Sequence, residues 1–309
     1  MTIEPHIRLG TRRSPLAMAQ AHETRARLCK AHGWQEDAVE LVPVEAGGDK
    51  VQDRPLADVG GKALWTRELD VWLAEGRIDA AVHSLKDVET IRPDAIALAA
   101  ILPRADRRDV LLGASSIAAI PQGARLGTSA PRRAAQMKNL RPDIEIVLFR
   151  GNVATRMAKL QAGEADVTLL AAAGLERLGE TGVGTPLDPA EWIPAPSQGA
   201  IGIECRAQDS RARDLLSAID DAATREEIEA ERAMLAALGG SCQSPVGILA
   251  ERQGAGVRLK VALFSADGAE RVDDTLDYHA GDAGAIRVFA KDLLARATPG
   301  IAALFSLAD

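Results

Sequence analysis

The feature that most constrains the fold is an internal repeat. The segments RLGTRRSPLAMAQ at 8–20 and RLGTSAPRRAAQ at 125–136 begin with the same four residues and continue through Ser, Pro and paired arginines into an alanine-rich stretch. Each is typical of a strand end followed by a helix start. Ser14 and Pro15 suit the N-cap and the first helical position.

A second pair of similar segments follows in the same order. TRELDVWLAEGRIDAAVHSL at 66–85 and TRMAKLQAGEADVTLLAAAG at 155–174 both predict a helix, a glycine, and an Asp that leads into an apolar strand. Two similarities in the same order predict two related α/β lobes. Because strands alternate with helices, each lobe is expected to contain a mainly parallel sheet.

The rest of the chain predicts two crossings and a third domain. Turn-rich stretches at 103–109 and 194–199 are expected to connect the lobes. A helix at about 225–238 precedes three short strands with QGAG and DGA turns, and a final helix begins near 282. This pattern predicts a small domain with an antiparallel sheet.

Composition excludes several classes of protein. The 309 residues are 47% hydrophobic and carry a net charge of −7, so nucleic acid is not an expected partner. No apolar run has the length of a signal peptide or a membrane span, which predicts a cytoplasmic protein with no membrane contact. Cys29, Cys205 and Cys242 are widely spaced and the five histidines are scattered, so we expect neither a disulfide framework nor a metal site.

Arginines are the main indication of a binding site. They cluster where strands end and helices begin, the positions at which α/β proteins bind anions. The seven are Arg12, Arg13, Arg132, Arg133, Arg150, Arg156 and Arg177. Any single arginine at such a position more often lies at a solvent-exposed helix end without binding a ligand. Seven of them in an acidic protein favour a polyanionic ligand in the cleft.

Other segments offer further candidates. AAVHSLKDV at 80–88 is predicted to be a strand that ends in Ser84, Lys86 and Asp87, where a Lys–Asp pair serves either acid–base chemistry or an ordinary ion pair. His83 is more typical of a structural histidine. The polar, glycine-rich stretch 45–62 resembles a lid, and its GGK lacks the Ser or Thr of a phosphate loop.

Cys242 lies in the loop GGSCQSPVG at 239–247, after a predicted helix that Gly239 and Gly240 would end. It has no Lys, Arg or His within four residues. It also follows a helix C-terminus, which does not lower a thiol pKa. The local sequence therefore indicates either an idle cysteine or an attachment point.

Taken together, these segments resemble the porphobilinogen deaminase (hydroxymethylbilane synthase) family. The resemblance rests on TRRSPLAMAQ, GGKALWTRELD, DAAVHSLKDV, LGTSAPRR, FRGNVATR, AAAGLERLG, SQGAIGIECR and GGSCQSPVG, in order from about residue 8 to 247. It implies a monomeric enzyme of tetrapyrrole and heme biosynthesis. Such an enzyme deaminates four porphobilinogens and joins them head to tail into hydroxymethylbilane.

The resemblance also implies an architecture. It predicts two periplasmic-binding-protein-like lobes with mainly parallel sheets, plus a small α/β third domain. Domain 1 would comprise 1–102 and 198–220 and carry the lid, domain 2 would comprise 103–197, and domain 3 would comprise 221–309.

Residue roles follow by position in the matched segments. Cys242 would carry a dipyrromethane cofactor through a thioether, and Asp87 would be catalytic, stabilising the cationic azafulvene left when ammonia departs. The cofactor would be held by Ser84, Lys86, Thr128, Ser129, Arg132 and Arg133. Substrate or growing chain would be held by Arg12, Gln20, Arg150, Arg156 and Arg177.

Some positions depart from the family pattern, namely Asp58, Trp65, Ala130, Pro131 and Ser241. None of them removes a group that the chemistry requires. The alternative is a non-catalytic bilobed binding protein for a polycarboxylate. That alternative leaves Cys242, Asp87 and the third domain without a role.

Overall fold

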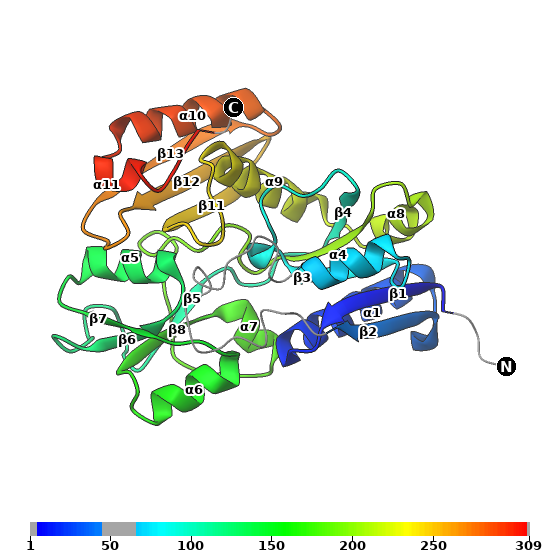
Figure 1. Cartoon of the computed structure of the whole chain (residues 1–309), viewed down its shortest axis with the longest axis horizontal. Coiled ribbons are helices and arrows are strands. Elements are labelled where there is room, and N and C mark those ends of the chain that lie inside the picture. The colour runs from blue at the N-terminus through cyan, green and yellow to red at the C-terminus, as the bar shows by residue number, and fades with distance from the viewer. Residues whose placement is uncertain (1–4, 45–65, 308–309) are drawn as a thin grey trace.

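The computed structural model describes residues 5–44 and 66–307. The expected lid at 45–62, with Asp58, and the neighbouring Trp65 lie outside the described residues. Figure 1 shows the two lobes side by side in its lower half, with the third domain above the second lobe.

The first lobe is built on a five-stranded sheet in the order β2-β1-β3-β10-β4. Its strands are β1 (Ile7–Arg12), β2 (Val39–Val44), β3 (Ala80–Ser84), β4 (Ile96–Ile101) and β10 (Ile201–Arg206). β1, β2 and β3 are parallel, whereas β10 is antiparallel to both of its neighbours. The helices of this lobe are α1 (Pro15–His32), α4 (Arg67–Ala74) and α8 (Ser210–Ser217).

The second lobe repeats this arrangement in the order β7-β6-β8-β5-β9. Its strands are β5 (Asp109–Leu112), β6 (Arg125–Thr128), β7 (Glu145–Leu148), β8 (Val167–Ala171) and β9 (Thr185–Pro186), and its helices are α5 (Pro131–Leu140), α6 (Val153–Gln161) and α7 (Ala172–Arg177). β6, β7 and β8 are parallel and β5 is antiparallel to β8. The two sheets therefore match strand for strand, as the sequence repeat predicts.

The chain passes between the sheets twice. It leaves the first sheet after β4, enters the second at β5, and returns after β9 to place β10 between β3 and β4. The strand beside β3 thus comes from a segment more than a hundred residues later in the chain.

The third domain has the predicted antiparallel sheet of β11 (Val246–Gln253), β12 (Gly256–Phe264) and β13 (Arg271–His279). Helices α9 (Ala222–Ala237) and α10 (Ala283–Arg296) contribute to the same core as Leu259, Val261 and Leu263 of β12, and α11 (Pro299–Ala302) follows them. Ala262 and Phe264 point to the opposite face and pack against Ala135 and Ile193 of the second lobe. Because side chains alternate between the two faces of β12, one face packs in the core of the third domain and the other packs against the second lobe.

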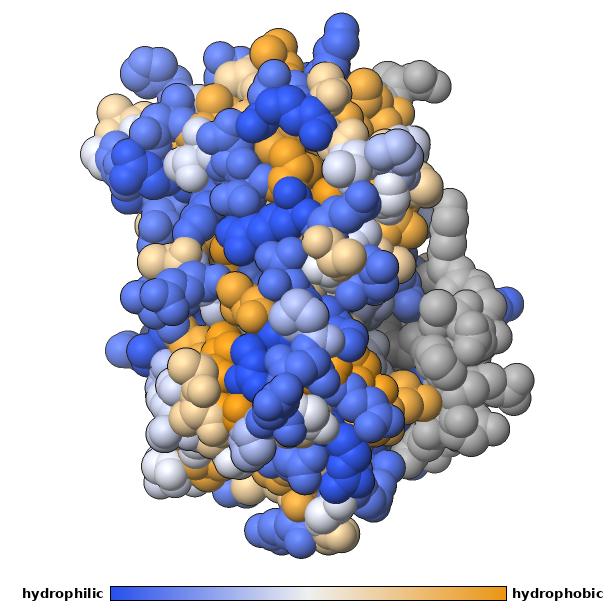
Figure 2. Space-filling model, turned by 90° about the vertical axis from the view of Figure 1, so that its left-hand side faces the viewer, coloured by the Kyte–Doolittle hydropathy of each residue, from blue (hydrophilic) through white to orange (hydrophobic). Residues whose placement is uncertain are grey.

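The expected fold class is confirmed: two parallel-rich lobes and a small α/β domain with an antiparallel sheet. Figure 2 shows one face of the molecule, on which hydrophilic residues predominate and apolar residues form small separate groups.

Local capping agrees with the sequence at the start of α1. The Ser14 Oγ accepts a hydrogen bond from the Ala17 amide at 3.3 Å, and Pro15 occupies the first turn. One predicted boundary is wrong. The strand at 80–88 ends at Ser84, and Lys86 and Asp87 lie on a 3₁₀ turn, Leu85–Asp87.

Candidate functional site

A cavity of about 820 Å³ lies where the two lobes and the third domain meet. Its described wall comes from the β1–α1 turn, the 3₁₀ turn after β3, the N-terminal turns of α5 and α6, the second crossing, and the cysteine loop before β11. The polar groups that the sequence singled out and that line it are Arg12, Arg13, Lys86, Asp87, Ser129, Arg132, Arg133, Arg150, Arg156 and Cys242. The cavity is therefore strongly cationic, with Asp87 and Glu180 as carboxylates on its described wall.

The 3₁₀ turn brings Asp87 into the cavity because Leu85 is held in the core. The Leu85 amide donates to the Ala200 carbonyl at 3.1 Å, and the Leu85 side chain fills the space above Gly202, where a Cβ would lie 2.3 Å from its Cδ2. With Leu85 buried, the next two residues, Lys86 and Asp87, face the cavity.

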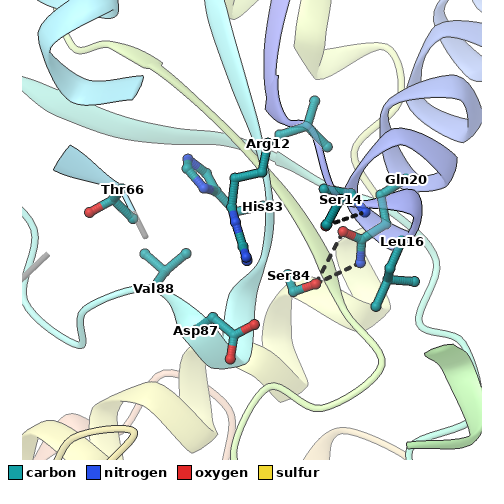
Figure 3. A pocket seen from close by; sticks show the side chains of 11 residues that line it. Arg12, Ser14, Leu16, Gln20, Thr66, His83, Ser84, Asp87 and Val88 are labelled. Atoms are coloured by element: carbon teal, nitrogen blue, oxygen red, sulfur yellow. Dashed lines mark hydrogen bonds between the residues drawn. The ribbon is translucent and has the colours of Figure 1, made fainter. Parts of the chain in front are cut away.

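A small side pocket of about 60 Å³ adjoins Asp87. Figure 3 shows Arg12 extending from the end of β1 toward Ser84 and Asp87. On the other side, the Gln20 amide nitrogen of α1 donates to the Ser84 hydroxyl at 2.7 Å. Arg12, Gln20, Ser84 and Asp87 are thus brought together from three separate segments.

His83 lines the same pocket and supports it from behind. Its Nε2 lies 3.3 Å from a carboxylate oxygen of the buried Glu204 on β10. Burial alone would raise the pKa of Glu204, but His83 and Arg92 outweigh it and lower that pKa to about 2. This network joins His83 to Glu204 and Arg92, and the structural role of His83 stays a prediction.

Lys86 lies beside Asp87 with an unusually low pKa. Burial in the cavity wall lowers the pKa of its ammonium to about 8, Asp87 opposes this effect, and the nearby Arg133 adds to it. The ammonium therefore lies within a cationic site whose charge an anionic ligand would neutralise.

Arg132 and Arg133 share a buried carboxylate. Both guanidinium groups donate to Asp109 at 2.7 Å, and the Trp192 indole N–H donates to the same side chain at 2.8 Å. Burial would raise the pKa of Asp109, but the two arginines hold it well below its usual range. Two arginines facing one carboxylate leave an excess positive charge at the start of α5.

Arg156 belongs to the first turns of α6, which begins at the Asn152 cap. Its Nε donates to the Gly151 carbonyl at 3.0 Å and its Nη2 to the Ser129 hydroxyl at 3.4 Å. Burial and the neighbouring Arg133 lower the pKa of Arg156 to about 10, so it stays charged at neutral pH. Arg150 precedes the same turn and is buried in the same wall.

Cys242 is exposed to the cavity in the loop between α9 and β11. Helix α9 ends as predicted, with Gly239 in the left-handed region at φ 61°. Although the residue as a whole is exposed, protein atoms surround its thiol, and this burial together with the charges of Asp87 and Glu89 raises the pKa of Cys242 to about 11. This agrees with the absence of an activating group in the local sequence, so the thiol is protonated at neutral pH. Cys29, Cys205 and Cys242 form no disulfide with one another.

The cysteine loop is tied to the segment that follows Asp87. The Thr90 hydroxyl donates to the Gly240 carbonyl at 3.2 Å, and Arg232 of α9 donates to the Glu89 carbonyl at 2.6 Å. Sequence reasoning did not select Arg232, which also lines the cavity. It lies in the middle of a helix, away from any strand end, so the pattern used to find the other arginines could not identify it.

Two predicted residues have other local roles. Thr128 is buried, and its Oγ1 accepts a hydrogen bond from the Ala130 amide at 3.1 Å, which shapes the turn before α5. Arg177 is not among the described residues of either cavity wall, and Glu23 and the Gly199 carbonyl engage its guanidinium. Its predicted strand–helix position is wrong. Helix α7 begins directly after β8, so Arg177 falls in the last turn, where a cation suits the helix dipole.

Among the described residues, no group of three or more His, Cys, Asp or Glu is arranged to hold a metal ion. No helix in that part of the chain is long and apolar enough to cross a bilayer. A cationic cavity with one exposed thiol and one central carboxylate is suited to a covalently held polycarboxylate and to the stabilisation of a cationic intermediate.

Comparisons with known proteins agree on one family. The family model described as "Porphobilinogen deaminase, dipyromethane cofactor binding domain" matches residues 7–214, and "Porphobilinogen deaminase, C-terminal domain" matches residues 225–286. A Sphingopyxis alaskensis protein named porphobilinogen deaminase is 57% identical, covering 97% of this chain and 96% of that protein. A Paracoccus denitrificans protein of the same name is 49% identical, covering 85% of each chain. Among solved structures, the BvgS VFT2 domain of Bordetella pertussis aligns with 73% of this chain and 90% of its own, at 12% identity and a TM-score of 0.41.

Proposed function

The chain belongs to the porphobilinogen deaminase family, and we propose that the cavity between its lobes and third domain is where it performs that family's reaction. It is a hydroxymethylbilane synthase of porphyrin and heme biosynthesis. It deaminates four porphobilinogen molecules and joins them head to tail into hydroxymethylbilane on a dipyrromethane primer, releasing ammonia. The family assignment favours this enzyme over a non-catalytic binding protein.

The cavity residues fit the dipyrromethane cofactor. Its two pyrroles carry carboxylates, and the wall around the exposed Cys242 thiol supplies Lys86 and the excess charge of the Arg132–Arg133 pair. We assign Cys242 as the point of attachment, with Ser84 and Ser129 as hydrogen-bonding neighbours. Thr128 acts on the cofactor through the turn that it shapes. When bound, the cofactor supplies the primer end on which the chain is built.

The substrate groups lie nearer the two lobe turns. Arg12 and Gln20 adjoin Asp87 in the small side pocket. Arg150 and Arg156 line the large cavity from the second lobe. Each porphobilinogen carries an acetate and a propionate, and arginine forks match carboxylates. We assign these four residues to the incoming unit or the growing chain. The family pattern also assigns Arg177 to the substrate or the growing chain.

Asp87 is the proposed catalytic residue. When ammonia leaves the incoming substrate, positive charge develops on the pyrrole. A second cation forms when a new carbon–carbon bond adds to the ring. A carboxylate beside the ring nitrogens stabilises both cations, and it can accept the proton that the ring then loses. The surrounding arginines hold the substrate carboxylates away from Asp87, which keeps this anion available.

The observation that carries the proposal is the placement of Asp87 and Cys242 in one cationic cavity, although they lie 155 positions apart in the chain. We further propose the division into domain 1 (1–102 and 198–220), domain 2 (103–197) and domain 3 (221–309), which supplies the cavity from all three parts. Finally, we propose that the protein works as a cytoplasmic monomer, without nucleic acid or membrane partners.

Intact mass tests the attachment residue. Protein made in cells that produce porphobilinogen should carry an added mass of two pyrrole units on the peptide that contains Cys242. Cys242→Ser should lose both the added mass and the activity. Cys29→Ser is the matched control and should keep both, because that thiol lies on α1 outside the cavity. An active enzyme with an unmodified Cys242 would overturn the assignment.

A further inference from the structure

Arg177 joins the two lobes. It ends α7 of the second lobe, and its Nε lies 3.2 Å from a carboxylate oxygen of Glu23 on α1 of the first lobe. The Arg177 side chain is only 9% exposed, whereas that of Glu23 is 29% exposed. The other carboxylate oxygen of Glu23 accepts from Arg27 one turn along α1. Glu23 therefore holds Arg177 from a helix that lies in the other lobe.

The same guanidinium contacts the two crossings between the lobes. Its Nη2 donates to the Gly199 carbonyl of the second crossing at 3.2 Å. That carbonyl also accepts from the Ala105 amide of the first crossing at 3.3 Å. The two crossings approach so closely that a Cβ on Gly199 would lie 2.6 Å from the Ala105 carbonyl oxygen. Arg177 thus bonds to the place where the two crossings meet. A rotation of one lobe against the other would hinge at this place.

The cavity edge lies immediately beside this contact. A Cβ on Gly174 of α7 would be 3.7 Å from a methyl group of Leu16 on α1, and both of these residues line the cavity. Leu178, which follows Arg177, lines it as well. A small shift of α7 against α1 would therefore change the distance between the walls that the two lobes contribute.

We propose that Arg177 is a positioning residue, which sets the separation of the lobes through Glu23 and the Gly199 carbonyl rather than by binding substrate carboxylates. The inference rests on the proposed function, because the affected walls carry Asp87 and Arg12 on one side and Arg150 and Arg156 on the other. The contact favours the arrangement in which these groups can act on one substrate. Its loss shifts the population toward arrangements in which they cannot.

Three variants separate this role from direct substrate binding. Glu23→Gln removes the anion but leaves Arg177, Arg177→Gln removes the cation, and the double variant removes both. Arg27→Gln is the matched control, because it removes the other partner of Glu23 without touching the contact between the lobes. Turnover is measured per mole of protein that carries the cofactor by intact mass, together with the thermal midpoint.

We expect Glu23→Gln and Arg177→Gln to lower kcat by similar factors. Coupling between sites typically spans about 5- to 150-fold, and we expect about fivefold to tenfold for this partly buried pair. The double variant should be no worse than Arg177→Gln alone, since both changes break the same contact. Arg27→Gln should retain the parent kcat and KM.

Two results would overturn the inference. If Arg177→Gln raised KM while Glu23→Gln matched the parent, Arg177 would be a direct substrate ligand. If both variants lost thermal stability but kept the parent kcat, the contact would be structural only. Neither result would affect the proposed function, which fails only if the parent protein itself carries no cofactor or makes no hydroxymethylbilane.

Discussion

The proposed roles of Cys242 and Asp87 depend on their surroundings rather than on activation by sequence neighbours. The pKa of Cys242 is raised, so the thiol is a poor nucleophile until a proton acceptor and a strong electrophile are present. A thiolate of raised pKa is also a poor leaving group, which would favour retention of the proposed thioether once it has formed. Asp87 lies in the same wall as Lys86, which we assign to the cofactor, and Arg12, which we assign to the substrate.

Substitution of Asp87 separates its charge from its shape. Asp87→Asn keeps the size and still accepts a hydrogen bond, but it can neither neutralise a cation nor accept a proton. Asp87→Glu keeps the charge one methylene farther out. We expect the Asn variant to lose at least about 10²-fold in turnover, the lower end of general acid–base catalysis, while the Glu variant keeps a measurable fraction.

Both Asp87 variants should still carry the cofactor, which intact mass will check before the rates are compared. If the Asn variant stayed within about tenfold of the parent, a barrier change of only about 1.4 kcal/mol, Asp87 would be a positioning residue.

Among the secondary-structure elements, the N-terminal turns of α5 and α6 divide the arginines into two groups. Arg132 and Arg133 in the first turn of α5 donate to the buried Asp109, and both residues line the cavity. Arg150 and Arg156 flank the turn before α6, where Arg156 bonds to the Gly151 carbonyl and to Ser129. The same local pattern, a strand end followed by a helix start, thus places two pairs of arginines at the cavity, to which we assign two kinds of anion contact.

This division predicts two phenotypes. Arg132→Leu or Arg133→Leu should leave mostly apoprotein, because cofactor carboxylates lose charge-assisted bonds worth about 1.5–3 kcal/mol each. Arg150→Leu or Arg156→Leu should keep the cofactor and accumulate covalent complexes with one or more added units. Native mass spectrometry distinguishes these species.

Asp109→Asn is the control for structural disturbance at the start of α5. It perturbs Arg132 and Arg133 without removing either of them. If it kept the cofactor while the Leu variants lost it, the arginine charge would be the cause. If all four Leu variants gave the same species, the division between cofactor and substrate arginines would be wrong.

At the scale of the whole molecule, the first lobe is completed by a strand that returns from the second. Glu204 on this strand, β10, accepts two hydrogen bonds from Arg92 at 2.9 Å each and faces His83 of β3. It therefore ties the returning strand both to its neighbour in the sheet and to the segment after Asp87. The turn that carries Asp87 therefore rests on a strand that only the folded two-lobe arrangement can supply.

The free energy of unfolding at acid pH should depend on these contacts of Glu204 with Arg92 and His83. The pKa of Glu204 is about 2 in the folded protein against 4.5 as its ordinary value, because His83 and Arg92 outweigh the cost of burial. A carboxyl with a lowered pKa stabilises the folded state above pH 4.5, and this stabilisation is lost as the pH falls toward 2. We expect Glu204→Gln to reduce the free energy of unfolding by about 3 kcal/mol at pH 7.

Urea unfolding of the holoenzyme at pH 7 and near pH 3 checks this prediction, with Glu229→Gln as the exposed control. The difference between parent and Glu204→Gln should shrink at the lower pH, whereas the control should differ little from the parent at either. An equally large difference at both pH values would show that the loss comes from packing rather than from charge.

The sequence alone determined the elements whose signals are local. The repeat predicted two related lobes, the strand and turn pattern after 238 predicted the third domain, and Ser14, Gly239 and Gly240 marked helix ends that the structure confirms. Strand ends and helix starts likewise selected most of the arginines that line the cavity, because parallel strands place these ends at a common edge.

Only the tertiary structure decided which of these residues meet. Periodicity cannot show that β10 returns to the first sheet, that Asp109 orders two arginines, or that Arg232 reaches the cavity from mid-helix. It also placed Arg177 at a strand–helix junction, whereas the structure shows its guanidinium joined to Glu23 at the contact between the lobes. These outcomes depend on contacts between residues tens to hundreds of positions apart, and such contacts form only when the domains pack together.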